Sequence, residues 1–326
     1  MNGGSKKPKR RRWGRRIFWI VILLIVLGAS AFIGTAWYNA KQTTDEMYTS
    51  SGATKQRSAS EVLSQKKPVS ILLLGTDTGD LGRSDTGRTD TIMIMTINPK
   101  TKKTTLVSIP RDMKVNLPDY PNQSPAKINS AYTYGGTKET INTVQKYFNI
   151  PIDYYVLVNM EGMKEAIDRV GGITVTSPLT FTYEGYSFTK GEATHMSGAK
   201  ALKFCRMRYD DPEGDYGRQK RQKLVIQALL KKSASYKTIL NKKFLKTISS
   251  NAKTDLTFNN MITLAKDYRS ATKNLKQDHA QGTDEEIDGQ SFQVISTTER
   301  QRVSNLLRKG LGLSTVDINS SPDKTK

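Results

Sequence analysis

The chain has 326 residues, of which 36% are hydrophobic, and a formal net charge of +21. This composition excludes a wholly disordered chain, because it supplies enough apolar side chain for one large domain or two modest ones. The single cysteine, Cys205, excludes an intramolecular disulfide, so stability must come from the core. The positive charge favours polyanionic partners, and composition alone does not separate nucleic acid, phospholipid and phosphate-bearing polymer.

The first 38 residues predict a membrane anchor. Residues 1–16 carry eight Lys or Arg and no acid, which leaves +13 for the remainder. Residues 17–38 follow as 22 residues without a charge, which at about 1.5 Å per residue can cross a hydrocarbon layer of about 30 Å. We therefore expect residues 1–16 to be a basic cytoplasmic tail and 17–38 a transmembrane signal-anchor helix, with residues 39 onward outside the cell.

The same segment has an alternative interpretation as a cleaved signal peptide, since residues 29–31 (Ala-Ser-Ala) resemble a cleavage site. Apolar sequence continues past this triplet through Phe32, Ile33 and Trp37, which a cleaved peptide does not need. The uncleaved anchor is the preferred interpretation. It predicts a single-pass type II protein of the cell membrane.

The first part of the outer segment alternates strands and helices. Residues 39–67, rich in Ser, Thr, Gln and Lys, predict a juxtamembrane spacer before a domain that begins at Pro68. The apolar run at 69–74 is typical of a strand buried on both faces. Strands are expected at 91–97 and 104–109, joined by a turn, then at 154–158 and 173–175, with helices at 137–148 and 159–171.

The second part adds helices at 197–204, 217–232, 259–275 and 299–310, and a strand at 292–296. The polar tail at 314–326 is expected to be disordered. Strands that alternate with helices predict a mixed α/β (α+β) fold, in which helices cover both faces of a central mixed sheet. We expect one extracytoplasmic domain at 68–313.

Two acids lie at the ends of predicted strands. Asp77 follows the buried strand at 69–74, and Asp90 immediately precedes the strand at 91–97, with Arg88 two residues before it. Residues at i and i+2 of an extended chain project to one side. Asp77 and Asp90 could share one hard cation, and carboxylate oxygens suit Mg²⁺ better than Zn²⁺. Asp77, which follows a strand, could instead be a turn former, and Asp85 repeats part of the pattern.

Four arginines and a glutamine complete a candidate anion site. Arg111 follows the strand at 104–109, where it could also simply pair with Asp112 or Asp119. Arg206 and Arg208 would point the same way if the backbone there is extended. Arg218 and Gln222 lie four residues apart on a helix expected to start at Gly217, whose free N–H groups would suit an anion.

The same part of the sequence allows other interpretations. Arg218 and Gln222 lie among Lys220, Arg221 and Lys223, so their helix could be a solvated basic one. The acidic loop at 210–215 lacks the ligand spacing of an EF-hand calcium site. Neither a Ser-His-Asp arrangement nor a nucleotide-binding loop is present, and His195 and His279 are isolated. A charged phosphorus group remains the ligand that these residues fit best.

The motifs together resemble the LytR-CpsA-Psr family of bacterial cell-envelope proteins, over roughly residues 69–232. The resemblance is carried by GTD at 75–77, RTDTIMI at 88–94, SIPRDM at 108–113, KIN at 127–129, AYTYGG at 131–136, DRVGGITV at 168–175 and RMRYDDPEGDYGRQKRQ at 206–222. The last stretch is most similar to the wall-teichoic-acid ligases of the family. Cys205 departs from the small polar residue expected there.

This resemblance implies a phosphotransferase on the outer membrane face of a Gram-positive bacterium. Its donor would be an anionic glycopolymer on an undecaprenyl-pyrophosphate carrier, and its acceptor the C6 hydroxyl of N-acetylmuramic acid in peptidoglycan. The resemblance also implies Mg²⁺ and a hydrophobic tunnel for the lipid tail of the carrier. Carried over by motif position, Asp77 and Asp90 would hold the metal, and the pyrophosphate would be bound by Arg88, Arg111, Lys127, Arg206, Arg208, Arg218 and Gln222.

Asp90 and Arg111 are the expected catalytic residues, and either Asp90 or Asp77, through a bound water, is the expected base. One alternative is a hydrolase that releases polymer from the same carrier with water. Another is a membrane-bound transcriptional regulator. The second is disfavoured because the basic tail and the arginines lie on opposite sides of the predicted span, so no nucleic-acid partner is expected.

Overall fold

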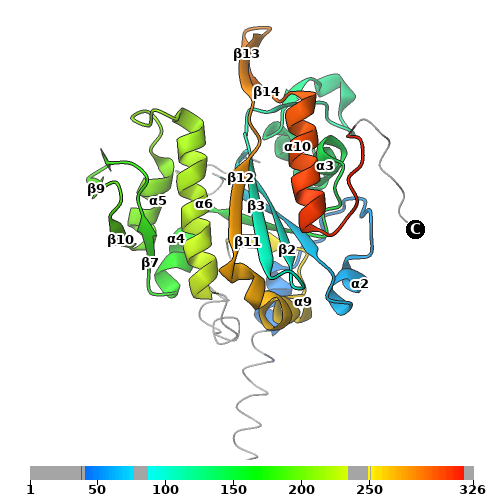
Figure 1. The fold of residues 1–326 in the computed structure, drawn as a ribbon, viewed down its shortest axis with the longest axis horizontal. Coiled ribbons are helices and arrows are strands. Elements are labelled where there is room, and N and C mark those ends of the chain that lie inside the picture. Colours follow the sequence, from blue (N-terminus) through cyan, green and yellow to red (C-terminus); the bar gives the residue numbers. More distant parts are fainter. Residues whose placement is uncertain (1–37, 39–40, 77–86, 234–248, 250, 319–326) are drawn as a thin grey trace, which may run out of the picture.

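The computed structural model describes residues 38, 41–76, 87–233, 249 and 251–318. Its centre is a six-stranded mixed sheet in the order β11-β6-β1-β2-β3-β12 (Figure 1). The strands are β1 (Val69–Thr76), β2 (Thr89–Asn98), β3 (Lys103–Ile109), β6 (Tyr154–Asn159), β11 (Ala252–Thr254) and β12 (Leu275–His279). The pairs β1–β2, β2–β3 and β6–β11 are antiparallel, and β1–β6 and β3–β12 are parallel. The predicted mixed α/β fold is confirmed.

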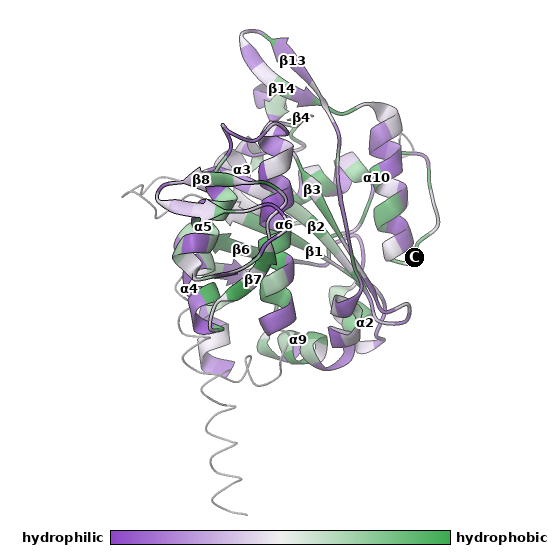
Figure 2. Ribbon diagram, turned by 60° about the vertical axis from the view of Figure 1, so that its left-hand side comes forward, coloured by the Kyte–Doolittle hydropathy of each residue, from purple (hydrophilic) through white to green (hydrophobic). Residues whose placement is uncertain are grey.

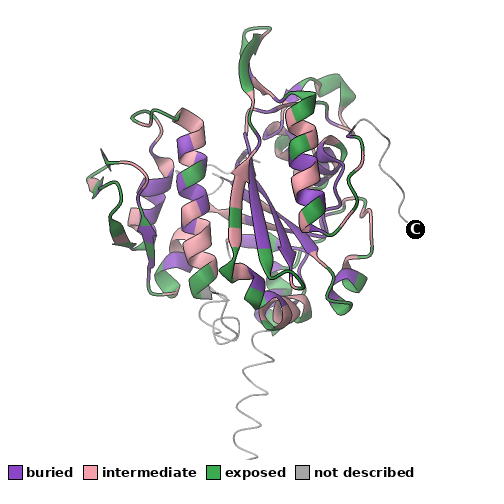
Figure 3. Cartoon of the chain, in the orientation of Figure 1, coloured by how far each residue is buried: buried purple, intermediate pink, exposed green. Residues whose placement is uncertain are grey.

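The central strands form because their residues are apolar on both sides, as β1 shows with one buried position after another. β2 and β3 make the predicted hairpin, in which Ile92 pairs with Ile109 and Asn98 with Lys103. Asn98 closes the turn, since its side-chain oxygen accepts hydrogen bonds from the backbone N–H groups of Lys100 and Thr101, both at 3.1 Å. The interior strands of the sheet are accordingly buried in Figure 3 and apolar in Figure 2.

Helices cover both faces of the sheet, as expected from the sequence. One face packs against α3 (Ser130–Phe148) and α10 (Thr297–Gly310). The other packs against α2 (Ala59–Ser64), α6 (Gly214–Ser233) and the segment formed by α9 (Phe258–Thr263), a π-helical turn (Leu264–Tyr268) and a 3₁₀ helix (Arg269–Lys273). The single helix predicted at 259–275 is thus replaced by three short helical segments of different type, and Leu275 begins β12.

A third apolar cluster lies to the left of the sheet in Figure 1. It contains α4 (Met160–Arg169), α5 (Gly198–Arg206) and the strand pairs β7 (Ile173–Thr176) with β10 (Ala193–Met196) and β8 (Phe181–Tyr183) with β9 (Tyr186–Phe188). Phe181, Phe188 and Phe204 pack their rings at its centre, with centroids 4.7 to 5.9 Å apart. The strand predicted at 173–175 is confirmed, but it lies outside the central sheet.

The predicted helix at 137–148 is the longer part of α3, which is kinked at its start. Gly136 has a φ of +62°, and Gly135 contacts the ring of Tyr120 so closely that a Cβ would collide with it. The glycine pair therefore lets the first turn of α3 lie against the loop that contains Tyr120. That loop includes a 3₁₀ helix (Pro121–Gln123) and the short strand pair β4 (Lys114–Val115) and β5 (Ala126–Lys127).

A hairpin of β13 (Thr283–Ile287) and β14 (Gln290–Val294) projects beyond the rest of the molecule at the top of Figure 1. Asp284, Glu285, Glu286 and Asp288 are exposed on it (Figure 3). Tyr216 of α6 contacts its base through a hydrogen bond of 2.8 Å between its hydroxyl and Gln293 Oε1. The strand predicted at 292–296 is thus confirmed as β14, shifted by two residues.

The folded part of the chain begins before Pro68, which corrects the interpretation of residues 39–67 as a spacer. Arg57 pairs with the buried carboxylate of Asp153 at 2.6 Å, and Lys55 with Asp255 at 2.8 Å. α2 adds buried apolar side chains to the sheet. Composition did not reveal this docking because the partners of the segment lie about a hundred or more residues away in sequence.

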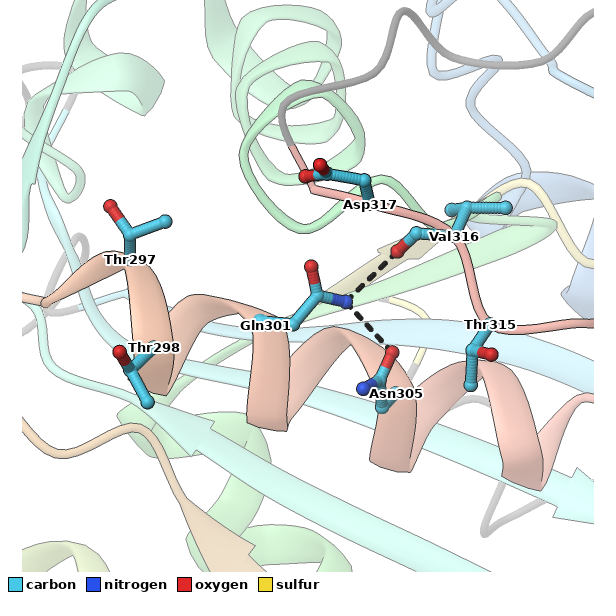
Figure 4. A pocket seen from close by; sticks show the side chains of 7 residues that line it. All are labelled: Thr297, Thr298, Gln301, Asn305, Thr315, Val316 and Asp317. Carbon is cyan, nitrogen blue, oxygen red and sulfur yellow. Dashed lines mark hydrogen bonds between the residues drawn. The ribbon is translucent and has the colours of Figure 1, made fainter.

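The tail predicted at 314–326 is also packed where it is described. Gln301 of α10 donates a hydrogen bond to the carbonyl of Val316 at 2.9 Å (Figure 4). Its side-chain oxygen accepts one from the backbone N–H of Ile318 at 2.8 Å. Ile318 is buried. The expectation of disorder is therefore wrong for 314–318, and the rest of the tail lies outside the described residues.

Within the described residues, no helix is long and apolar enough to cross a membrane. The predicted tail at 1–16 and all of the predicted span at 17–38 except Tyr38 lie outside those residues.

Glu139 makes the stability of this fold depend on pH. The carboxyl is buried beneath the loop at 117–123, and this burial raises its pKa above the ordinary value of 4.5. A raised carboxyl pKa favours the protonated folded state, so stability should fall as pH rises from about 4.5 through the folded pKa. We expect Glu139→Gln to remove this loss, as measured by thermal unfolding across pH. The exposed Glu161→Gln on α4 is the control, and a wild-type pH profile retained by Glu139→Gln would contradict the assignment.

Candidate active site

The predicted charged residues meet at the end of the sheet where β1 and β3 finish and β2 begins. Ile92 of β2 pairs with Ile109 of β3. Asp90 lies two residues before this pair and Arg111 two residues after it, so the hairpin register brings them together. Arg111 Nη1 donates a hydrogen bond to Asp90 Oδ1 at 2.8 Å. The convergence of these two expected catalytic residues is confirmed.

Arg111 is the centre of a chain of opposite charges. Its Nε lies 3.4 Å from Asp112 Oδ2, and Asp112 Oδ1 lies 3.3 Å from Lys127 Nζ. Partial burial lowers the pKa of Arg111, but the hydrogen bond to Asp90 and the charges of Asp90, Asp112 and Asp215 outweigh this effect, so its pKa is raised. The guanidinium is thus fixed as a cation.

Arg218 approaches the same place from α6. Its Nη2 lies 2.6 Å from Asp215 Oδ1, one turn earlier on the helix, although the geometry is not that of a directed hydrogen bond. The side chain is 11% exposed, and its Nε has no hydrogen-bond partner among the described residues. Burial lowers the pKa of Arg218, the charges of Arg111 and Arg208 lower it further, and Asp215 and Asp90 oppose this change. A buried cation beside other cations favours an incoming anion.

Arg206 and Arg208 do not lie on one extended strand. Arg206 is the last residue of α5 and not part of an extended strand, so that expectation is wrong. Lys203 lowers the pKa of Glu184, and the charge of Arg206 adds to this effect, which places Arg206 near β8–β9. Arg208 contributes to the field at Arg218, with its guanidinium 4.9 Å from the ring centroid of exposed Tyr209.

Gly217 does not begin α6, which starts at Gly214. Its N–H donates to the carbonyl of Glu213 at 3.5 Å and is not available to an anion. The glycine is needed for space, because a Cβ there would overlap the carboxylate of Asp211. That carboxylate pairs with Arg221, whose side chain is completely buried. The predicted helix start at Gly217 is therefore wrong.

α6 is also not a solvated basic helix. Arg221 donates to the carbonyls of Phe204 and Met207, and Lys223 Nζ to the carbonyl of Asp278 at 3.0 Å. Gln222, the predicted glutamine of the anion site, lies one turn after Arg218 and is buried. Arg221 and Lys223, on either side of Gln222, thus hold the helix in place through their hydrogen bonds, whereas Lys220 is exposed.

Arg88 and Lys127 lie on the α3 side of the charged cluster. Arg88 is exposed and lies two residues before Asp90 in the sequence. The hydroxyl of Thr133, near the start of α3, donates a hydrogen bond of 3.4 Å to the carbonyl of the preceding residue, Gly87. The Nζ of Lys127 lies 5.8 Å from the ring centroid of Phe292 on β14. Both cations line one polar pocket of about 370 Å³.

An apolar cavity of about 260 Å³ lies beside α6, on the face of β1 and β2 opposite to the polar pocket. It begins next to the charged cluster, since Gly75 and Thr91 line it and pair with each other one residue from Asp90. Its other lining residues are Met47, Leu73, Leu74, Met95, Val156, Val158, Gly162, Met163, Ala166, Ile226, Leu229, Leu230, Ala252, Thr254 and Met261. A third hollow, between α10 and residues 315–317 (Figure 4), is polar and has no cationic lining residue.

Asp77, one of the two predicted metal ligands, lies outside the described residues. Thr76 precedes it and pairs with Thr89, the neighbour of Asp90. Asp90 contacts Arg111 through Oδ1, and its Oδ2 has no partner in the described part of the chain. That oxygen fits a hard cation. The described ranges contain no group of three or more His, Cys, Asp or Glu that could hold a metal ion.

Sequence reasoning missed two acids of the site. Asp112 was considered only as a trivial partner of Arg111, yet it links Arg111 to Lys127. Asp215 lies in the acidic loop that was considered only for calcium, and it orients Arg218. Its spacing of three residues from Arg218, at a helix start where acids are favourable, was the available signal.

The fold and the charged cluster together define an α/β domain with a cationic site between an apolar cavity and a polar pocket. A sequence model of the LytR_cpsA_psr family matches residues 34–309, so the chain belongs to the LytR-CpsA-Psr family. A relative from Enterococcus faecalis is 42% identical over 302 residues, which cover 91% of this chain and 98% of the relative. It is named polyisoprenyl-teichoic acid–peptidoglycan teichoic acid transferase TagU.

Two solved structures share the fold. The crystal structure of Bacillus subtilis TagU superposes with a TM-score of 0.61 at 37% identity, covering 77% of this chain and 100% of that one. A structure described as TagT bound to LI-WTA superposes with a TM-score of 0.63 at 26% identity, covering 76% and 92%. The relatives thus include proteins named as transferases of teichoic acid.

Proposed function

We propose that the protein is a phosphotransferase at the outer face of the cell membrane. It moves an anionic glycopolymer, wall teichoic acid by analogy with its relatives, from an undecaprenyl-pyrophosphate carrier to the C6 hydroxyl of N-acetylmuramic acid in peptidoglycan. The observation that carries this proposal is the convergence of the mostly buried Arg218 and the partly buried Arg111 beside Asp90. The name of the relative from Enterococcus faecalis supports it.

The cluster suits a pyrophosphate because positive charge exceeds negative charge around Arg218. Arg111 and Arg208 lie near it as further cations, and Asp215 and Asp90 are the neighbouring acids. The charges of Arg111 and Arg208 lower the pKa of Arg218, so a bound diphosphate would relieve repulsion that is already present. Arg218 also has a buried Nε with no partner among the described residues. Guanidinium groups bind phosphate oxygens through two parallel hydrogen bonds. Arg111 and Arg218 are therefore assigned to the pyrophosphate, with Arg88, Lys127 and Arg208 around them.

In the proposed reaction, the acceptor hydroxyl oxygen attacks the phosphorus that bears the polymer. A new P–O bond joins polymer to glycan, and the bond from that phosphorus to the oxygen of polyprenyl phosphate breaks. The hydroxyl proton passes through a bound water to the carboxylate of Asp90, which Arg111 holds in place through Oδ1. Arg111 and Arg218 stabilise the negative charge that develops on the departing phosphate.

The apolar cavity supports a lipid carrier. It runs beside the sheet from Gly75 and Thr91, next to the charged cluster, to Met47 and Met261. Met47 belongs to the helical segment 41–47, which follows the predicted membrane span. A polyprenyl chain entering there would place its pyrophosphate at the cluster. The hydrophobic lining would keep the polyprenyl chain out of water after it leaves the bilayer.

Mg²⁺ is proposed as a cofactor, held by Asp90 Oδ2 and Asp77. Asp77 follows Thr76 directly in the sequence, and Thr76 pairs with Thr89, the neighbour of Asp90. Bound Mg²⁺ would add positive charge at the pyrophosphate, and hard oxygen ligands are the ones it prefers.

Reconstitution tests this function. Full-length protein in lipid nanodiscs is supplied with lipid-linked teichoic acid and uncrosslinked glycan strands, and polymer bound covalently to glycan is measured. We expect attachment with Mg²⁺, its loss on EDTA treatment and its recovery when Mg²⁺ is restored. Free polymer without attachment would instead indicate hydrolysis, and attachment unaffected by EDTA would contradict the metal proposal.

A further inference from the structure

The polar pocket beside Arg88 and Lys127 has a lining unlike that of the apolar cavity. It lies between the first turn of α3, the loop at 122–127 and the tip of the β13–β14 hairpin, which supplies Gln290. Its remaining lining residues carry mainly amides and hydroxyls, and they are Asn122, Gln123, Ser124, Pro125, Ala126, Asn129, Ser130 and Tyr134. Amides and hydroxyls both donate and accept hydrogen bonds, as do the hydroxyls of a sugar.

Tyr134 adds an aromatic surface to this pocket. Its side chain is 41% exposed, and its ring lies on Tyr120 with a centroid distance of 5.9 Å. The glycine pair that follows Tyr134 lets α3 approach Tyr120, so the ring is held from behind. A supported, half-exposed tyrosine among amides can pack against the C–H face of a pyranose ring while its neighbours bind the hydroxyls.

Asn129 indicates that the pocket is built for a polar ligand. The residue is 3% exposed, and its side-chain oxygen has no hydrogen-bond partner among the described residues. A buried polar atom without a partner is costly, by about 1 to 3 kcal/mol, and is uncommon unless a ligand or water completes it. The backbone N–H of Asn129 donates to the carbonyl of Arg111 at 3.1 Å, which connects this wall directly to the charged cluster.

The pocket and the apolar cavity lie on opposite faces of the same sheet edge. Thr91 lines the cavity, whereas Arg88 lines the pocket, and Asp90 lies between them on β2. Lys127 joins the pocket to Arg111 through Asp112. Displacement at phosphorus requires the attacking and departing oxygens to be roughly in line. With the lipid leaving group on the cavity side, the attacking hydroxyl must arrive from the pocket side.

Charge distinguishes the two saccharides of the proposed reaction. The hairpin beside the pocket exposes Asp284, Glu285, Glu286 and Asp288, which repel a polyanionic donor polymer. We propose that this pocket binds a sugar of the acceptor glycan, uncrosslinked peptidoglycan, and presents its hydroxyl to the cluster. This assignment rests on the proposed function and deepens it by locating the second substrate.

The test compares Tyr134→Ala and Gln290→Ala with wild type, as full-length protein in nanodiscs. Tyr48→Ala, which removes another half-exposed tyrosine that lines neither site, is the matched control. We expect the pocket variants to raise the KM for glycan strands by roughly 5- to 10-fold. The KM for lipid-linked donor and the thermal unfolding midpoint should not change, and more of the donor should be hydrolysed to free polymer.

If the variants raise the KM for the donor and leave the KM for the acceptor unchanged, the pocket belongs to the donor sugar and the inference is overturned. No change in either KM would also overturn it. Titration of uncrosslinked glycan strands into the protein without donor gives a readout independent of transfer. Weaker binding by Tyr134→Ala supports the acceptor site even if wild type fails to attach polymer, in which case only the proposed function fails. Equal binding of glycan strands by wild type and Tyr134→Ala would overturn the proposed acceptor site. If wild type still attaches polymer in that case, the proposed function stands.

Discussion

Replacing Arg111 by alanine is expected to lower the rate of polymer attachment by at least about 100-fold while the protein remains folded. Arg111 both contacts Asp90 at 2.8 Å and faces the same cluster as Arg218, so its loss removes a cation from the pyrophosphate and releases the proposed base. The side chain is about one-fifth exposed, which limits the cost to the fold. Steady-state attachment by full-length protein in nanodiscs measures the effect.

Two controls define the result. Arg111→Lys keeps the charge but loses the two-pronged geometry, so we expect an intermediate rate. Arg302→Ala removes an exposed arginine on α10 that pairs with Glu299 and Asp278, and it should leave attachment unchanged. Turnover by Arg111→Ala equal to wild type would remove Arg111 from the site.

Replacing Arg221 by methionine is expected to reduce the free energy of unfolding by about 3 to 5 kcal/mol. The substitution leaves Asp211 as a buried carboxylate without its partner and strips two carbonyls, those of Phe204 and Met207, of their donor. These contacts fix the segment that carries Arg208 against the helix that carries Arg218. Loss of attachment should therefore accompany loss of stability, as measured by thermal unfolding and transfer assays.

Lys220→Met is the matched control, since this neighbour is exposed and its pair with Glu213 is at the surface. We expect a change within about 0.5 kcal/mol. The double variant Asp211→Ala with Arg221→Met should lose less stability than the sum of the two single variants, because it leaves no unpaired charge. Additive losses would show that the two residues do not interact as the structure describes.

Local signals predicted much of the fold. The apolar runs at 69–74, 91–97 and 104–109 became β1, β2 and β3, because strands buried on both faces need apolar residues throughout. The cap at Asn159 and the Gly171–Gly172 pair correctly bounded α4, since Asn159 accepts a hydrogen bond from Gly162 at 2.8 Å. Asp90 and Arg111 could be paired from their positions at strand ends alone.

Other features depend on distant partners and could not be predicted locally. Arg221 and Lys220 are adjacent and chemically alike, yet one is buried and the other exposed, because only Arg221 faces Asp211 and the end of α5. The β7–β10 region and the docking of residues 49–67 likewise follow from packing against elements far along the chain. Gly217 shows the same limit, since its role is to make room for a carboxylate from another segment.

The register of β2 on β3 links folding to activity. A slip of one residue would turn Ile92 away from its side of the sheet and carry Asp90 out of range of Arg111. The apolar packing that selects the native hairpin therefore also assembles the reactive pair, in a single cooperative event. A chain with a shifted hairpin would therefore lack the contact between Asp90 and Arg111 on which the proposed reaction depends.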